Sequence, residues 1–345
     1  MNFPAQCRAT AIGSFPHDNA DAALDMILEH LADIPVWPQL PKRGFIEGMC
    51  PQYSEGLPAV HLDEREDKIS VDTGHDLPGH MEKFYEHYMN EDLAPFAISE
   101  HAAPGLFAYV KRLKGSSGIV AAKGHTTGPV TWGLTVADQD KRASWYNDML
   151  RDGIVKGLAR KAAWQVQQLK AVNERVIIFV DEPYLQSYGS AAVPLREDET
   201  VSALNEVMEG IHGGGAHAGI HVCGNTDWGM ITRTQTDIIN FDAFEYAQAI
   251  SLFYREIGGF LEKGGILAWG ITPSTSAIDG VNRDGLVADL RRGFGLLIKK
   301  GIQEDLILDR ALITPSCGGG SLTVEQNLKM LECTAGVSRV LRGDK

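Results

Sequence analysis

Residues 219–225 read GIHVCGN, a short apolar run between glycines that predicts a buried β-strand. His221 and Cys223 are two residues apart, so their side chains are expected on the same face of this strand. An imidazole beside a thiol at the end of a strand supplies two of the ligands of a zinc site. The alternative for H-x-C alone is a buried cysteine next to a hydrogen-bonded histidine. The residues that follow favour the zinc site.

Two later stretches bring further metal-binding side chains to strand ends. The run IINFDAFEYA carries Glu245 near its end, and Cys317 follows the run ALITPS. Together with His221 and Cys223, they offer two thiolates, one imidazole and one carboxylate, a donor set that suits zinc better than magnesium or calcium. We therefore predict a zinc site in which the hard oxygen ligand, Glu245, gives up its place to an incoming substrate sulfur.

Apolar runs and helical patterns alternate on both sides of this stretch. Several runs are apolar throughout, as in strands that are buried on both faces. A doubly wound sheet would need a glycine-rich phosphate turn after an early strand, and IGSFP (residues 12–16) is not such a turn. The pattern therefore predicts an α/β fold, a (β/α)8 TIM barrel. Its eight strands are expected at residues 9–15, 34–40, 118–130, 174–183, 219–225, 238–247, 265–272 and 311–319.

One interruption breaks this alternation, between the second and third predicted strands. Residues 41–117 hold a long loop and two helical segments, near 79–89 and 105–113, without a separate apolar pattern of domain size. We interpret 41–117 as an insertion that covers the active-site end of the barrel. The whole chain, 1–345, is then expected to be a single domain, which is a usual size for a barrel with insertions.

The composition argues against several classes of partner. With a formal net charge of −13, the chain is expected to repel nucleic acid and anionic membranes. No apolar run is long enough to span a bilayer, and the first residues lack the apolar core of a signal peptide. The five cysteines are scattered, which is typical of thiols in a reducing compartment. A cytoplasmic location is therefore expected.

Polar side chains concentrate at the carboxyl ends of the predicted strands. In a TIM barrel this rim holds the active site, whereas polar residues with purely structural roles would show no such preference. Asp181 and Glu182 are adjacent at one strand end, so only one of them is expected to face the pocket. His125 either binds substrate or holds the turn that follows it. The rim residues are Ser14, His125, Thr127, Asp181, Glu182, His221, Cys223, Glu245 and Cys317.

In sequence order, the motifs IGSFP, TGPVT, DEP, H-x-C, a later glutamate and a final cysteine resemble the catalytic half of the cobalamin-independent methionine synthases. The resemblance covers most of the chain and thins over the insertion. It implies a (β/α)8 barrel, Zn2+ held by the four ligands named above, and homocysteine bound at its amino acid end by Ser14 and Asp181. We predict catalytic roles for Asp181 and His125, with Glu182 and Thr127 as further substrate-binding candidates.

The departures from this family concern the methyl donor. Folate-dependent members carry an acidic residue where this chain has Ser187, and a histidine near the place of Thr272. A pterin amine must be protonated to leave, whereas a methyl-corrinoid needs no proton. The two departures therefore favour methyl transfer to a thiol from methylcobalamin or another corrinoid, with a corrinoid protein as a candidate partner.

Three alternatives remain open from the residues alone. In the first, the acceptor is another thiol such as coenzyme M, because HVCGN is also similar to corrinoid-linked thiol methyltransferases of the uroporphyrinogen decarboxylase superfold. Those enzymes typically lack the glutamate, which Glu245 supplies here. The second is a uroporphyrinogen decarboxylase-like enzyme, which would need a basic rim for its carboxylated substrate. The third is a non-catalytic protein that binds zinc or carries a corrinoid.

Overall fold

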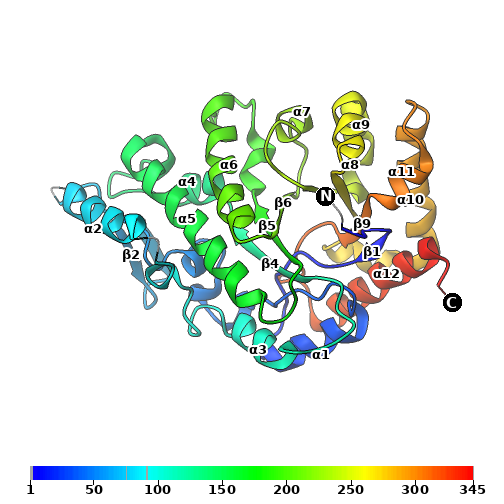
Figure 1. Ribbon diagram of the computed structural model, residues 1–345, viewed down its shortest axis with the longest axis horizontal. Helices are drawn as coiled ribbons and strands as arrows, with labels where there is room; N and C mark the ends of the chain where they lie inside the picture. The colour runs from blue at the N-terminus through cyan, green and yellow to red at the C-terminus, as the bar shows by residue number, and fades with distance from the viewer. Residues whose placement is uncertain (1–2, 75, 91, 345) are drawn as a thin grey trace.

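Seven parallel strands form one curled sheet at the centre of the molecule (Figure 1). The computed structural model describes residues 3–74, 76–90 and 92–344. The spatial order is β1-β9-β8-β7-β6-β5-β4, so all the strands point the same way and their carboxyl ends share one edge. The strands are β1 Arg8–Ala9, β4 Ala122–Thr127, β5 Val176–Asp181, β6 His217–Val222, β7 Ile238–Asp242, β8 Ile266–Thr272 and β9 Ala311–Pro315.

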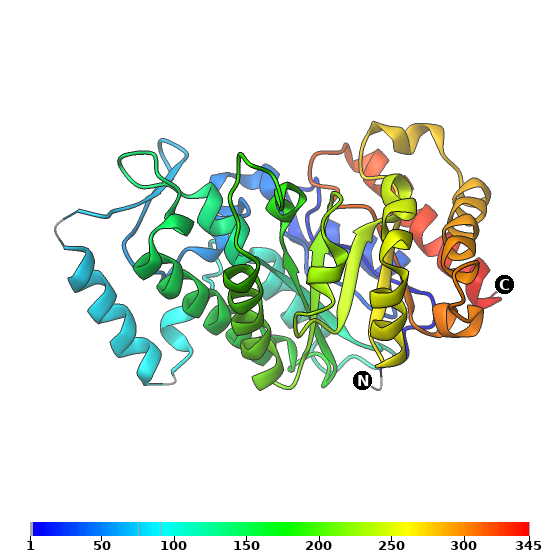
Figure 2. The ribbon, with the colours of Figure 1, turned by 90° about the horizontal axis from the view of Figure 1, so that it is seen from above.

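Helices follow the strands and lie outside the sheet, as Figure 2 shows from a second direction. The first, α1, begins at Ala20, because the Asn19 side chain accepts a hydrogen bond from the backbone N–H of Ala22 at 2.9 Å and caps the helix. Among the described residues, no helix has both the length and the apolar character needed to cross a membrane. The helices around the sheet are α1 Ala20–His30, α3 Pro104–Leu113, α4 Pro129–Thr135, α5 Asp148–Leu169, α6 Glu197–Gly213, α7 Trp228–Ile231, α8 Ala243–Ile250, α9 Tyr254–Glu262, α10 Arg283–Ile298, α11 Glu304–Asp309 and α12 Val324–Arg342.

Both faces of the sheet are buried, which explains the uninterrupted apolar runs. In β5, Ile178 and Val180 pack in the large core shared with the helices, whereas Ile177 and Phe179 pack in a smaller core on the other face. This is the alternation expected of a strand. The next residue on the inner face is Asp181, so the apolar interior gives way to polar side chains at the carboxyl end of the sheet.

The predicted second strand, residues 34–40, is wrong as a regular strand. This segment makes two isolated parallel bridges, Val36 with Lys123 and Ser14 with Gln39. Two backbone hydrogen bonds join it to β4, from Trp37 N to Lys123 O (3.2 Å) and from Lys123 N to Pro35 O (3.1 Å). Two more join it to the chain after β1, from Phe15 N to Gln39 O (2.8 Å) and from Gln39 N to Gly13 O (2.8 Å). Because Pro35 and Pro38 have no backbone N–H, the hydrogen-bond ladder is interrupted on both sides of Trp37. The segment therefore contacts β4 and the chain after β1 without forming an assigned strand.

The region 41–117 contains an antiparallel hairpin that the sequence did not suggest, β2 (Val60–Asp63) with β3 (Lys68–Val71). The two predicted helices are confirmed as α2 (Leu77–Met89) and α3. Helix α3 packs against α1, and α2 packs against α5 at the end of the molecule away from α10 and α12 (Figures 1 and 2). The loop before the hairpin reaches the strand ends, since the Tyr53 hydroxyl donates to His125 O at 2.8 Å.

Candidate metal centre

The structure brings His221, Cys223 and Cys317 together at the carboxyl edge of the sheet. One ligand atom from each, a ring nitrogen or Sγ, lies within 4.8 Å of the other two. His221 is near the end of β6, and Cys223 comes directly after this strand. Cys317 follows β9, which is separated from β6 in the sheet by β7 and β8. The curl of the sheet therefore brings together side chains that are almost 100 residues apart in the sequence, as predicted for three of the four proposed ligands.

His221 presents one nitrogen to this cluster in the state that a metal requires. Its ring is buried, and Nδ1 hydrogen bonds to Oδ1 of Asn240 at 2.5 Å. Nε2 is buried and has no hydrogen-bond partner among the described residues. Burial lowers the pKa of His221 to about 4, so the ring is neutral at pH 7 and Nε2 offers a lone pair. This orphaned buried acceptor fits a metal ligand.

The two thiols share a hydrogen bond that favours one thiolate. The thiol of Cys317 donates to Cys223, which lowers the pKa of Cys223 to about 7 although burial opposes the shift. The same hydrogen bond, together with burial, raises the pKa of Cys317 well above its ordinary value. Near neutral pH, Cys223 therefore carries much of the negative charge before any cation binds. One neutral imidazole with two cysteines is a donor set that zinc accepts readily.

Glu245, the fourth proposed ligand, is not part of this group. It was expected at a strand end, but β7 ends at Asp242 and Glu245 lies exposed in the first turn of α8. The Asp242 side chain accepts a hydrogen bond from Glu245 N at 2.9 Å and caps the helix. Because of this cap, the strand ends at Asp242, five residues before the predicted end at residue 247. Metal ligation by Glu245 stays a prediction.

A cavity of about 430 Å³ opens directly above the three ligands. Among its lining residues are two carboxylic acids, Asp181 and Glu47, and neither a lysine nor an arginine. Position 320 in the lining has room only for a glycine, because a Cβ on this residue would lie 2.1 Å from Ser14 Oγ. The cavity is lined by Ile12, Ser14, Gln39, Pro41, Glu47, Met49, Asp181, Pro183, His221, Cys223, Cys317, Gly318, Gly320 and Ser321.

Asp181 lies beside the candidate metal ligands and faces the cavity. It is the register partner of His221 between β5 and β6, and its buried Oδ1 has no hydrogen-bond partner in the described chain. Burial raises the pKa of Asp181 to about 8, and the positive charge of Lys123 opposes the shift. Lys123 is buried inside the sheet, where Nζ donates to Ile12 O at 2.8 Å. A cationic group bound in the cavity would pair with the carboxyl group of Asp181.

Three other predicted site residues do not line the cavity. Glu182 turns away and accepts hydrogen bonds from the backbone of α4, which agrees with only one of the two adjacent acids facing the pocket. The hydroxyl of Thr127 donates to Met49 O. The buried ring of His125 stacks on Trp37 with centroids 4.0 Å apart, and neither of its nitrogens has a partner among the described residues. Their substrate-binding and catalytic roles stay predictions.

Glu182 braces the fold, so its replacement is expected to cost stability and leave zinc binding intact. The carboxylate accepts from Val130 N (2.9 Å), Thr131 N (2.8 Å) and Thr131 Oγ1 (2.6 Å) while fully buried. In Glu182→Gln, an NH2 group faces these donors, and we expect the free energy of unfolding to fall by about 1–3 kcal/mol in urea. Glu174→Gln, at an exposed position just before β5, is the control and should change it by less than about 0.5 kcal/mol. Equal stabilities would contradict the bracing role.

Two residues of the centre were missed as site residues from the sequence. For Glu47 the sequence leaves open a loop that closes over the substrate or a solvated loop; in the structure its buried carboxylate accepts from Leu40 N at 3.1 Å and lines the cavity. Asn240 was read as part of an apolar strand. A polar residue inside the run IINFD was the available signal for Asn240, because a buried amide needs partners. Glu47 carried no signal, since nothing local shows that its loop folds onto the strand ends.

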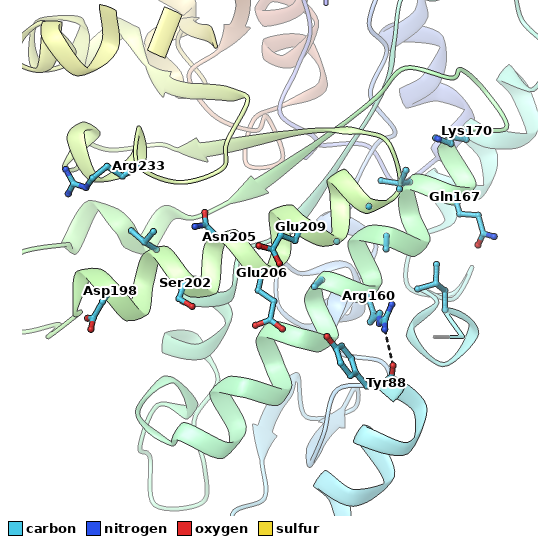
Figure 3. Close-up of a pocket in the computed structure, with 18 of the residues that line it drawn as sticks. Tyr88, Arg160, Gln167, Lys170, Asp198, Ser202, Asn205, Glu206, Glu209 and Arg233 are labelled. Carbon is cyan, nitrogen blue, oxygen red and sulfur yellow. Dashed lines mark hydrogen bonds between the residues drawn. The ribbon is translucent and has the colours of Figure 1, made fainter. Parts of the chain in front are cut away.

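A larger hollow, of about 1320 Å³, lies on the outside between α5 and α6 (Figure 3). No histidine or cysteine is among the residues that line it. Two of its cationic side chains have partners within the protein: Arg233 pairs with Glu197 at 2.5 Å, and Arg160 donates to Tyr88 O at 3.0 Å (Figure 3). This groove therefore lacks the convergent reactive groups of an active site, and size alone does not locate the chemistry.

Comparison with known proteins supports the fold. No protein-family model and no curated protein sequence matches the chain. Among solved structures, a methyltransferase from Methanosarcina mazei superimposes with a TM-score of 0.57 at 15% identity, covering 97% of this chain and 94% of that chain. The chain shares its fold. A protein of Listeria monocytogenes named for the vitamin-B12-independent methionine synthases superimposes with a TM-score of 0.55 at 14% identity, covering 93% and 85%.

Proposed function

We propose that this protein is a zinc-dependent methyltransferase that methylates a thiol, with homocysteine as the substrate and methionine as the product. The observation that carries the proposal is the cluster of His221, Cys223 and Cys317 at the floor of a cavity that also presents Asp181. Solved structures with a similar fold include a methyltransferase and a protein named for the methionine synthases, which agrees with this chemistry.

The three clustered side chains would hold the metal, and Glu245 is proposed as the fourth ligand. When bound, zinc would keep the substrate sulfur as a thiolate, because a coordinated thiol loses its proton near neutral pH. Two properties of the protein favour metal binding: His221 is neutral near pH 7, and the pKa of Cys223 is lowered. The cavity walls would confine the substrate next to the ligands.

The cavity lining favours an amino thiol over the alternatives. Asp181 offers an unpaired carboxyl oxygen to an ammonium, and the Ser14 hydroxyl is available to the substrate carboxylate. The carboxylate of Glu47 is already paired with Arg43 at 3.3 Å. Coenzyme M carries a sulfonate, and porphyrin-like substrates carry several carboxylates, so both would require basic side chains. Neither lysine nor arginine lines this cavity. Homocysteine therefore fits better than coenzyme M, and a decarboxylase of the uroporphyrinogen type is not favoured.

We propose a methyl-corrinoid, free or on a corrinoid protein, as the methyl donor. Thr272 lies at the end of β8, and Ser187 lies in the turn after β5. At these two positions methyl transfer from a pterin would need an acidic group for protonation, and this chain has hydroxyl groups instead. The cavity is near the low end of ligand pockets, which span about 300–1,000 Å³, so an amino acid fills it while a corrin ring stays at the mouth. Pro41, Met49 and Pro183 supply apolar surface on its walls.

Two segments of the fold and the cellular location belong to the same proposal. We propose that residues 34–40 act as the eighth member of the barrel, since the segment bridges to Lys123 and to Ser14. Residues 41–117 would be an insertion over the active-site end, because Met49 and Glu47 reach the cavity from this region. A cytoplasmic location is proposed, where the thiols of Cys223 and Cys317 would stay reduced.

A panel of methyl donors and thiols tests the function directly. Zinc-loaded protein is incubated with methylcobalamin or methyltetrahydrofolate, and with homocysteine or coenzyme M, and each methylated product is measured. We expect methionine from methylcobalamin, and turnover with methyltetrahydrofolate at least about 100-fold slower because acid catalysis is missing. The Cys317→Ala protein provides the blank. Turnover with the folate and none with any methyl-corrinoid would overturn the donor. Tight zinc binding without alkyl transfer to any thiol would instead indicate a non-catalytic zinc protein.

A further inference from the structure

We propose that Asn240 is a positioning residue that sets the tautomer and the orientation of His221, and through them the affinity of the centre for its metal. This inference rests on the proposed function, because that function names zinc as the metal. The hydrogen bonds on which the inference rests all lie within the protein and include no metal. Asn240 is fully buried in β7 and is the register partner of His221 in β6.

The Asn240 amide links four consecutive strands of the sheet. Its Oδ1 lies 2.5 Å from His221 Nδ1 in β6. Its Nδ2 donates to Ala268 O in β8 at 2.9 Å and to Thr314 Oγ1 in β9 at 2.8 Å. Cys317 follows β9 by two residues, so this polar connection joins the strand of the histidine ligand to the strand of a cysteine ligand.

These partners allow one orientation of the amide. A backbone carbonyl can only accept a hydrogen bond, so the Asn240 nitrogen must face Ala268 O and the oxygen must face His221. An amide oxygen also only accepts, and therefore His221 Nδ1 must carry the ring proton. The lone pair is then on Nε2, the buried nitrogen without a partner among the described residues. Asn240 thus prepares His221 for ligation before any metal arrives.

The alternative is that Asn240 only satisfies buried backbone groups and has no effect on the metal. A variant that keeps the branched shape of the side chain and removes its hydrogen bonds separates the two roles. Asn240→Leu is such a variant, and Thr314→Val removes one of the two acceptors that orient the amide. Ile239→Val is the matched control, because Ile239 is the adjacent residue of β7 and packs in the outer core, away from His221.

The test has one readout with metal and one without. We expect zinc affinity, from competition with a chromophoric chelator, to fall by about 10–100-fold in Asn240→Leu, by less in Thr314→Val, and not measurably in Ile239→Val. In the metal-free protein labelled with [15N]histidine, His221 should carry its proton on Nδ1 in the wild type and the control. In Asn240→Leu it should shift at least partly to Nε2.

The outcomes distinguish this proposal from the function on which it rests. Wild-type zinc affinity together with an unchanged Nδ1–H tautomer in folded Asn240→Leu would overturn the positioning role. If Asn240→Leu does not fold, unchanged affinity and tautomer in Asn240→Ala, which removes the same hydrogen bonds with a smaller side chain, would overturn it equally. A tautomer that shifts as expected in a protein that never binds zinc would leave the positioning role standing and remove the proposed function instead.

Discussion

Purified Cys317→Ala is expected to contain almost no zinc and to lose its methyl transfer activity. Cys317 is one of only three side chains that the described structure brings within 4.8 Å as a ligand group, so its loss leaves two. Removing a group that merely supports a ligand costs about 10–100-fold in metal affinity or activity, and loss of the ligand itself should cost more than about 100-fold. Metal analysis by mass spectrometry should show a fall from about one equivalent in the wild type.

Cys333→Ala is the matched control for this experiment. Cys333 is also a largely buried cysteine, but it lies in α12 and does not line the cavity. We expect Cys333→Ala to keep its zinc and its turnover. Full zinc with normal turnover in Cys317→Ala would show that the centre is misassigned. An equal loss of zinc from both variants would point to unfolding as the cause of metal release.

Asp181→Asn is expected to weaken catalysis with homocysteine by a large factor and to leave the zinc content unchanged. The substitution keeps the shape of the side chain and removes the carboxyl group, which would ionise when it pairs with the substrate ammonium. Truncating one partner of a buried, hydrogen-bonded charge pair costs about 2–5 kcal/mol, which is about 30-fold to 4,000-fold in kcat/KM. Steady-state kinetics at saturating methyl donor measures this ratio.

A thiol without the amine shows whether this loss comes from the ammonium. With 4-mercaptobutanoate, which is homocysteine lacking its amino group, the wild type and Asp181→Asn should differ by less than about threefold, because no charge pair is lost. Equal losses with both thiols would show that Asp181 acts on the sulfur or on the metal centre. An unchanged rate with homocysteine would exclude Asp181 from substrate binding.

The sequence by itself determined most of the order of the fold and the three clustered ligands. Strand and helix patterns depend on local spacing, so the alternation from β4 to β9 was readable from apolar runs. His221 and Cys223 share a face because of their spacing, and Cys317 follows a strand in a sheet whose carboxyl ends meet. The prediction of 34–40 as a strand failed because apolar character was weighed above the two prolines that interrupt its hydrogen bonds.

Only the tertiary structure decided which rim residues turn towards the cavity. Asp181 and Glu182 are equivalent in sequence, yet the first faces the cavity and the second is bound by the backbone of α4. Glu245 leaves the cluster because Asp242 starts a helix before it. The lining by Glu47 and the contact of Asn240 with His221 depend on chain segments that are distant in sequence. Local spacing decides which side chains reach the rim, whereas contacts between distant segments decide their direction and charge.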